Sequence, residues 1–236
     1  MALSQTIDRS PQRKALTPPG SDVANKADAA HADGMVSLYR SILLALPDVS
    51  CRLIEVISAH TGEGVSTVVC GLAETASALG NARVLVCDAT PERATLKHFG
   101  ATAVIGTLND VAAGKIELRQ AMLVLPSRNF AVCAVSDPGS NSLISVNLDV
   151  FDAVFAPLRA QFDLILIDAP AVNAGPLGPA LARKADGVIF VVEAERTRVP
   201  VIAAARRVLE VNGAHMLGVV LNKRRFHVPD SIYRWL

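Results

Sequence analysis

The sequence lacks the features that mark membrane-spanning, secreted and nucleic-acid-binding proteins. No apolar run in its 236 residues approaches the roughly 20 that a bilayer-spanning helix needs, and the N-terminus carries no continuous hydrophobic region of the secretory type. The formal net charge is only +1, so no basic field favours a nucleic-acid partner. We therefore expect a cytoplasmic protein, without a nucleic-acid partner, whose contact with a membrane is peripheral or through a partner.

Cysteines and aromatic residues are also scarce. The four cysteines form no C-x-x-C pair and have no histidine cluster nearby, as zinc sites and redox pairs would require: Cys51, Cys70, Cys87 and Cys133. We expect all four to be small buried hydrophobic residues in a reducing compartment. Aromatic residues make up 4% of the chain, whereas Ala, Val and Leu are abundant. That composition suits short buried strands alternating with helices.

The chain divides into a tail, one α/β domain and a short final segment. Residues 1–33 mix Pro, Gly, Ser, Ala and charges without a period, which predicts a disordered tail. Residues 34–222 are enough for one α/β domain, with a leading helix over 35–46 that Pro47 stops. Residues 223–236 are basic and aromatic, and whether they contact an anionic membrane, a partner subunit or the edge of the sheet stays open.

Strands and helices alternate through this domain. Strands are expected over 52–57, 83–88, 130–135, 162–168, 187–194 and 217–222, and helices over 66–79, 105–114, 149–160, 177–185 and 198–211. The alternation predicts a three-layer, doubly wound, mostly parallel sheet with helices on both faces. Ligands of such sheets bind beyond the carboxyl ends of the strands, so the residues that follow each strand are the functional candidates.

The stretch SAHTGEGVST, after the first strand, has the form of a phosphate-binding loop. Gly62 and Gly64 let the backbone approach an anion, and Ser66, where a helix begins, is placed to bind Mg²⁺. The pattern G-x-x-x-x-G-K-[ST] fails twice, because its first glycine is Ala59 and its lysine is Val65. Loss of the lysine should reduce the rate of phosphoryl transfer more than the affinity for nucleotide, because transfer depends on charge stabilisation.

Two other interpretations of the loop stay open. A dinucleotide fingerprint, G-x-G-x-x-G, nearly fits residues 62–67, with Asp88 ending the next strand, but its third small residue is Thr67 and its turn is wide. The stretch is otherwise a plain strand-to-helix connection, in which turn glycines and a Ser-Thr pair have only local roles.

Two aspartates end strands downstream of the loop, in the chain order that a nucleotide site requires. Asp88 ends RVLVCD, and Asp168 ends DLILID, which has the Walker B form whose carboxylate reaches Mg²⁺ directly or through water. Either aspartate alone is a common structural feature. Together with the loop, they predict a Mg²⁺ site made by Ser66, Asp88 and Asp168.

The combined motifs resemble the cytoplasmic bacterial tyrosine kinases, the kinase halves of polysaccharide co-polymerases, which are related to the MinD and ParA ATPases. The family's loop looks like S-A-x-P-G-E-G-K-S-T, its second motif like L-L-I-D-A-D-L-R and its Walker B like D-x-V-I-I-D-T-P-P. This chain reads SAHTGEGVST, VLVCDATPER and DLILIDAPAV, and SLYRSI, GTLNDVAAGK, ADGVIFVVEAERT and LGVVLNKRR match further stretches. The resemblance covers about residues 35–225 and implies a P-loop NTPase fold of the MinD/ParA type.

The resemblance also implies a role for each matching residue. ATP or ADP with Mg²⁺ is expected to bind weakly at Gly62, Glu63, Gly64, Val65, Ser66, Thr67 and Asn222, the last of these near the adenine. In an active enzyme, Asp88 would be the base or lie beside Mg²⁺, and Asp168 would be the second catalytic carboxylate. MinD-type proteins fit less well, because they carry an extra lysine where this chain has Ala59-His60.

Several departures from the family pattern coincide with the missing lysine. The second acidic residue of D-x-D is Thr90, the ring motif E-x-x-R-x-x-R keeps only Arg40, and the tyrosine-rich tail is reduced to Tyr233. We therefore expect a kinase-like subunit of exopolysaccharide or capsule biosynthesis with weak or lost phosphotransfer. It would regulate polymerisation or export at the inner membrane, through the cytoplasmic ends of a membrane-embedded co-polymerase, and a homo-oligomer stays open.

Two alternatives remain. One is an active tyrosine autokinase in which Arg93 or a partner's basic residue replaces the lysine and Tyr233 accepts the phosphate. The other is an ATPase switch of the MinD/ParA type.

Overall fold

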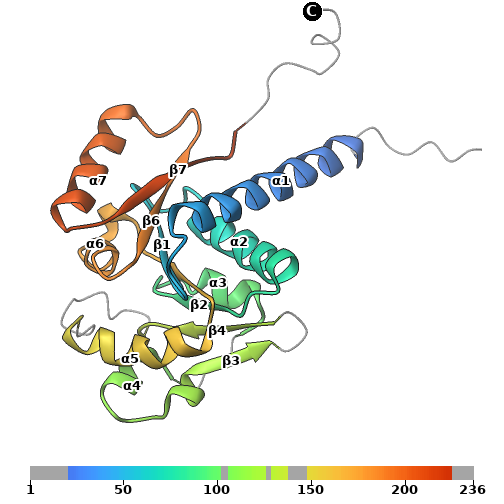
Figure 1. The fold of residues 1–236 in the computed structure, drawn as a ribbon. Helices are drawn as coiled ribbons and strands as arrows, with labels where there is room; N and C mark the ends of the chain where they lie inside the picture. Colours follow the sequence, from blue (N-terminus) through green and yellow to red (C-terminus); the bar gives the residue numbers. More distant parts are fainter. Residues whose placement is uncertain (1–20, 102–105, 126–128, 138–147, 225–236) are drawn as a thin grey trace, which may run out of the picture.

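The computed structural model describes residues 21–101, 106–125, 129–137 and 148–224, which form one sheet covered by helices (Figure 1). The sheet has seven strands in the order β3-β4-β2-β5-β1-β6-β7. All neighbours are parallel except β3, which pairs antiparallel with β4. The strands are β1 (Arg52–Ser58), β2 (Val84–Asp88), β3 (Met122–Leu125), β4 (Phe130–Ala134), β5 (Leu164–Asp168), β6 (Gly187–Glu193) and β7 (Met216–Asn222).

Helices cover both faces of the sheet. They are α1 (Ser21–Ala45), α2 (Val65–Gly80), α3 (Ala94–His98), α4 (Leu108–Ala112), α5 (Leu148–Gln161), α6 (Leu177–Ala182) and α7 (Val199–Val211), with 3-10 turns η1 (Leu118–Ala121) and η3 (Val172–Ala174). One hydrophobic cluster lies under α1, α2 and α3, and the other lies under α4 to α7. The predicted three-layer, mostly parallel architecture is confirmed.

Two elements had no counterpart in the sequence-based expectation. Strand β3 has only four residues, two of them exposed, and α3 has only five, so neither is long enough to show a hydrophobic period. Helix α1 begins at Ser21, well before the expected start at 35, and so includes part of the expected tail. Residues 1–20 and 225–236, and with them Tyr233 and most of the basic aromatic segment, lie outside the described residues.

Helix α1 packs on α2 through buried residues that include Tyr39. The Tyr39 side chain lies against Gly80, where any Cβ would crowd its hydroxyl. Burial raises the pKa of Tyr39, and only 8% of the residue is exposed. The four cysteines are also buried and unpaired, as predicted, with the sulfurs of Cys87 and Cys133 3.4 Å apart across β2 and β4.

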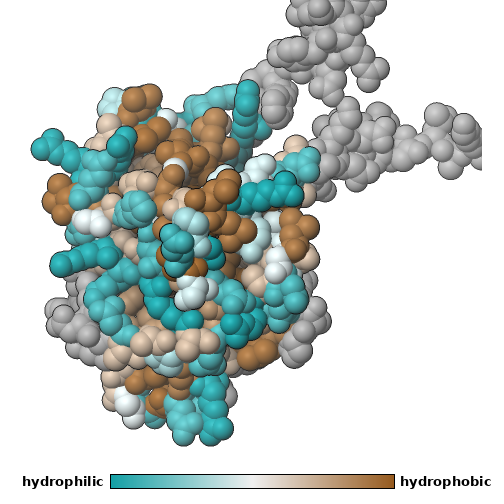
Figure 2. Space-filling model, in the orientation of Figure 1, coloured by the Kyte–Doolittle hydropathy of each residue, from teal (hydrophilic) through white to brown (hydrophobic). Residues whose placement is uncertain are grey.

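Strand β7 forms one edge of the sheet and leaves apolar side chains in the open. Val219 and Leu221 are 61% and 56% exposed. Figure 2 shows hydrophobic surface gathered over the part of the molecule built from β7 and α7, where Val199 and Val211 are also exposed. None of the helices in the described ranges combines the length and the apolar character needed to cross a membrane.

Candidate nucleotide site

The loop between β1 and α2 has the backbone geometry of an anion cradle. Gly62 and Gly64 have φ values of 90° and 97°, a region that favours glycine, and α2 begins directly at Val65. The first helical hydrogen bond runs from the Val68 N–H to the Gly64 carbonyl, 3.1 Å away. No hydrogen bond within the described part of the chain uses the N–H groups of residues 63–66. These donors are free to bind an anion such as a phosphate.

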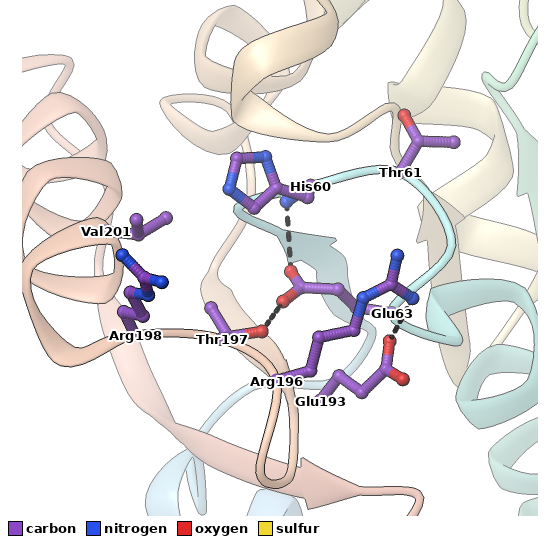
Figure 3. A pocket seen from close by; sticks show the side chains of 8 residues that line it. All are labelled: His60, Thr61, Glu63, Glu193, Arg196, Thr197, Arg198 and Val201. Carbon is purple, nitrogen blue, oxygen red and sulfur yellow. Dashed lines mark hydrogen bonds and ion pairs between the residues drawn. The ribbon is translucent and has the colours of Figure 1, made fainter.

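The Glu63 side chain stabilises the loop internally. Only 3% of Glu63 is exposed, and its carboxylate accepts hydrogen bonds from the His60 N–H at 2.9 Å and from the Thr197 hydroxyl (Figure 3). The Ser58 hydroxyl donates to the His60 carbonyl at 2.8 Å. Glu63 therefore fixes the loop's shape with its side chain, and only its backbone N–H is free for the nucleotide that the sequence predicts there.

A pocket of about 250 Å³ lies beside the loop, between the loop and the start of α7 (Figure 3). It is lined by His60, Thr61, Glu63, Glu193, Arg196, Thr197, Arg198 and Val201. Arg196 contacts the Glu193 carboxylate at 3.2 Å. The side-chain amide of Asn173, in η3, lies 2.7 Å from Nδ1 of His60, and the backbone N–H of Asn173 donates to the Ala59 carbonyl. The loop is thus linked to the segment that follows Asp168.

The residue in the lysine position, Val65, is part of the hydrophobic core. It is 8% exposed and packs in the cluster under α1 and α2. The Val65 side chain has no charge that could stabilise an anion bound in the loop, and its methyl groups pack among apolar neighbours. The loop therefore has the donors of a phosphate site and lacks the charge that the pattern normally supplies.

Both carboxylate oxygens of Asp88 accept hydrogen bonds from residues that follow it closely in the sequence. One oxygen accepts from the Thr90 N–H at 2.9 Å and the Thr90 hydroxyl at 2.6 Å, and the other accepts from the N–H groups of Thr95 and Leu96 at 3.1 and 3.2 Å. Burial raises the pKa of Asp88, and these hydrogen bonds oppose the rise. Thr90, which stands where the family has a second acidic residue, here orients the first.

Asp168 lies directly opposite Asp88 across β5 and β2 and is fully buried. Its Oδ2 accepts from the Thr95 hydroxyl, whereas Oδ1 is buried without a hydrogen bond of normal geometry to any described residue. Burial first, and the Asp88 charge second, raise the pKa of Asp168 to about 7, against hydrogen bonding from Thr95 and Ser66. A carboxyl oxygen buried without a partner is a group that a metal ion would satisfy.

These residues fit the Mg²⁺ that the sequence predicts. Asp168 offers Oδ1, directly or through water, and the Ser66 hydroxyl lies close enough to the Asp168 carboxyl to lower its pKa by hydrogen bonding. Asp88 has both oxygens engaged, so we expect it to orient water around the ion. Mg²⁺ there would neutralise phosphate oxygens. The described residues contain no cluster of three or more His, Cys, Asp or Glu side chains able to hold a metal by themselves.

The pKa of Asp168 predicts a pH-dependent response to Mg²⁺. A folded-state pKa near 7 means that the ion must displace a proton below that pH, so Mg²⁺ binding should strengthen as pH rises through 7. Between pH 6 and 8, we expect Mg²⁺ to improve the affinity for a fluorescent ADP analogue by a factor that grows about three- to tenfold. Asp168→Asn should bind the analogue equally with and without Mg²⁺. A Mg²⁺ effect that survives in Asp168→Asn would show that the ion binds elsewhere.

Arg93, proposed from the sequence as a replacement for the lysine, has other contacts. It adopts a φ of 50° at the start of α3, and its guanidinium lies 3.3 Å from the Ser136 carbonyl and 3.4 Å from the Asp137 carboxylate. Its Nε is buried without a partner in the described part of the chain. None of these contacts involves the loop.

Four side chains that shape the site had no role assigned to them from the sequence. Thr95 contacts both aspartates, Thr197 caps Glu63, and Glu193 and Lys223 form an ion pair beside the loop at 3.2 Å. Glu193 ends β6, Thr197 lies in the segment after it, and Lys223 follows β7, so their position at strand ends was the signal in the sequence. Thr95 lies in a short helix that shows no sequence period.

Comparison with known proteins agrees with this geometry. No family model matches the chain. The tyrosine-protein kinase CpsD of Streptococcus agalactiae serotype III is 24% identical over 172 residues, which cover 73% of this chain and 74% of CpsD. The putative tyrosine-protein kinase EpsB of Ralstonia nicotianae is 29% identical over 198 residues, which cover 83% of this chain but only 26% of EpsB.

Solved structures share the fold. The kinase domain of Escherichia coli tyrosine kinase ETK superposes with a TM-score of 0.76 at 20% identity, covering 92% of this chain and 86% of that one. MinD of Pyrococcus horikoshii, complexed with Mg-ADP, superposes with a TM-score of 0.59 at 24% identity, covering 78% and 76%. The chain is thus a homologue of bacterial tyrosine-protein kinases, with the α/β fold of their kinase domains and of MinD-type P-loop ATPases.

Proposed function

We propose that the chain is a tyrosine-kinase-like subunit of capsule or exopolysaccharide biosynthesis that holds Mg-ATP weakly and has weak or lost phosphotransfer. The observation that carries this proposal is Val65, which is buried in the core at the position where the family's loop has lysine. The free loop N–H groups and the unpartnered oxygen of Asp168 support residual nucleotide binding. Transfer needs stabilisation of charge on the phosphoryl group, and Val65 contributes none.

The small number of tyrosines also supports weak or lost phosphotransfer. Tyr39, the one tyrosine in the described residues, is buried between α1 and α2, so it is unavailable as a phosphate acceptor in the folded protein. The other, Tyr233, lies outside the described residues. A chain with two tyrosines offers little substrate for the autophosphorylation that the family resemblance implies.

The proposed role is then structural and regulatory. The domain would dock on the cytoplasmic ends of a membrane-embedded co-polymerase, remain peripheral to the inner membrane through that partner, and adjust chain length or export. This part of the proposal rests on the family resemblance. The exposed apolar side chains of β7 and α7 provide surface for a protein contact.

An autophosphorylation assay tests the proposal. Purified wild type is incubated with Mg-ATP and probed for phosphotyrosine, next to Asp168→Asn, which keeps the side-chain shape and removes the metal-binding charge. We expect the wild-type signal to be absent or only slightly above that of Asp168→Asn. A strong wild-type signal that Asp168→Asn abolishes would overturn the proposal and establish an active autokinase. ATP-dependent dimers in sedimentation, without phosphotyrosine, would instead favour a switch of the MinD/ParA type.

A further inference from the structure

Two side chains at the end of β7 donate hydrogen bonds to backbone carbonyl groups of the phosphate loop. The Asn222 amide donates to the Glu63 carbonyl at 2.9 Å, and the Lys223 ammonium donates to the Gly62 carbonyl at 2.6 Å. The fit is close, because a Cβ at residue 64 would overlap the Asn222 amide and lie 3.8 Å from Cε of Lys223. Gly64 thus permits both the positive φ of the loop and the approach of β7.

These two hydrogen bonds act on the peptide groups that face the anion. The Gly62 carbonyl shares a peptide with the Glu63 N–H, and the Glu63 carbonyl shares one with the Gly64 N–H. Donation to a carbonyl polarises the N–H of the same peptide and strengthens it as a donor. Both N–H groups lack an acceptor within the described residues. The effect is larger for Lys223, whose donor is a full charge.

Lys223 is also fixed in place. Its ammonium lies 3.2 Å from the Glu193 carboxylate at the end of β6, while 44% of its side chain is exposed. The Lys223 side chain therefore joins the end of β6 to the loop carbonyl of Gly62. The Lys223 ammonium is thus held against a loop in which Val65 occupies the usual lysine position.

We propose that Lys223 is a positioning residue that supplies to the phosphate loop the positive charge Val65 lacks, acting on ATP through the loop's peptide groups and through space. The inference rests on the proposed function, because it requires that the loop bind the phosphates of ATP. Asn222 and Lys223 together would then explain why this loop retains affinity for ATP. For Asn222, this role is in addition to the expected contact with the adenine.

A double-mutant cycle tests the inference. Mg-ATP affinity is measured by calorimetry for wild type, Lys223→Met, Val65→Lys and the double variant. Lys223→Arg is a control that keeps the positive charge. Lys184→Met is a control that removes a lysine away from the loop, where Lys184 forms an ion pair with Asp152 at 2.7 Å. We expect Lys223→Met to weaken binding about tenfold, or roughly 1.4 kcal/mol, and Lys223→Arg and Lys184→Met to change it less than twofold. In the Val65→Lys background, Lys223→Met should cost less than threefold, because the loop then has its own lysine.

The outcomes separate this inference from the proposed function. Lys223→Met binding as tightly as wild type, or losing the same factor in both backgrounds, would overturn the role of Lys223 and leave the proposed function intact. Absence of binding in both wild type and Val65→Lys would overturn the nucleotide site itself. Thermal melts of each variant establish folding, and because Lys223 is partly exposed, we expect shifts of only a few degrees. If Lys223→Met does unfold, Lys223→Gln at the same concentrations answers the same question.

Discussion

Val65→Lys should bind Mg-ATP about 10- to 100-fold more tightly than the wild type. The new lysine would be the first residue of α2, next to the loop. Its ammonium would make charge-assisted hydrogen bonds to phosphate, each worth roughly 1.5–3 kcal/mol. The free N–H groups of residues 63–66 and the free oxygen of Asp168 are already in place to bind the rest of the phosphate and its ion. Calorimetric titration with ATP, with and without Mg²⁺, measures the gain.

Val65→Met is the matched control. It has a similar length and removes the same buried valine, which is 8% exposed, but adds no charge. Both variants enlarge a buried side chain and should therefore lose stability, about 1–3 kcal/mol, while only the lysine gains affinity. Equal affinities of Val65→Lys, Val65→Met and wild type would show that the loop does not receive phosphate.

Glu55→Met should stabilise the protein by about 1–3 kcal/mol at pH 8. Glu55 lies in the central strand β1, is fully buried, and has no hydrogen-bond partner for either carboxyl oxygen among the described residues. Leaving a buried polar group unsatisfied costs about that much, and more if it is charged. Burial raises the pKa of Glu55 well above its ordinary value of 4.5, so the folded protein keeps a proton that the unfolded chain releases. Stability is therefore lost as pH rises from 4.5 towards the folded-state pKa.

Urea denaturation at pH 5 and pH 8 measures this effect. The gain from Glu55→Met should be larger at pH 8, since the wild type pays the cost of retaining the proton only above 4.5. Glu210→Met, which removes an exposed glutamate paired with Arg206, should change stability by less than about 0.5 kcal/mol at either pH. A Glu55→Met variant less stable than wild type at pH 8 would mean that the carboxyl group has a partner in solution.

The sequence was most informative where strands end. Continuous apolar runs identified six of the seven strands, and parallel topology then placed Asp88, Asp168 and the loop together at the carboxyl ends of the central strands, as observed. That inference works because a parallel sheet brings the carboxyl ends of its strands together whatever the side chains are. The short β3 and α3 escaped because four or five residues cannot display a period.

Side-chain partners within the site could not be predicted in the same way. The carboxylate of Glu63 turns to His60 and Thr197, and Lys223 reaches back across 161 residues of sequence to Gly62. Such contacts depend on the separation and twist of neighbouring strands, which a one-dimensional pattern does not encode. The burial of Glu55 was equally hidden, because the sequence of a strand does not show whether the helix that covers it leaves one carboxylate open to solvent.

The most direct test of the account is a calorimetric titration of the wild-type protein with ATP in the presence and absence of Mg²⁺ at pH 8. The phosphate loop keeps the shape of an anion cradle and lacks its usual positive charge. We therefore expect weak, saturable ATP binding that Mg²⁺ strengthens and that is at least tenfold weaker than in Val65→Lys. Wild-type affinity equal to that of Val65→Lys, or no saturable binding at millimolar ATP, would contradict it.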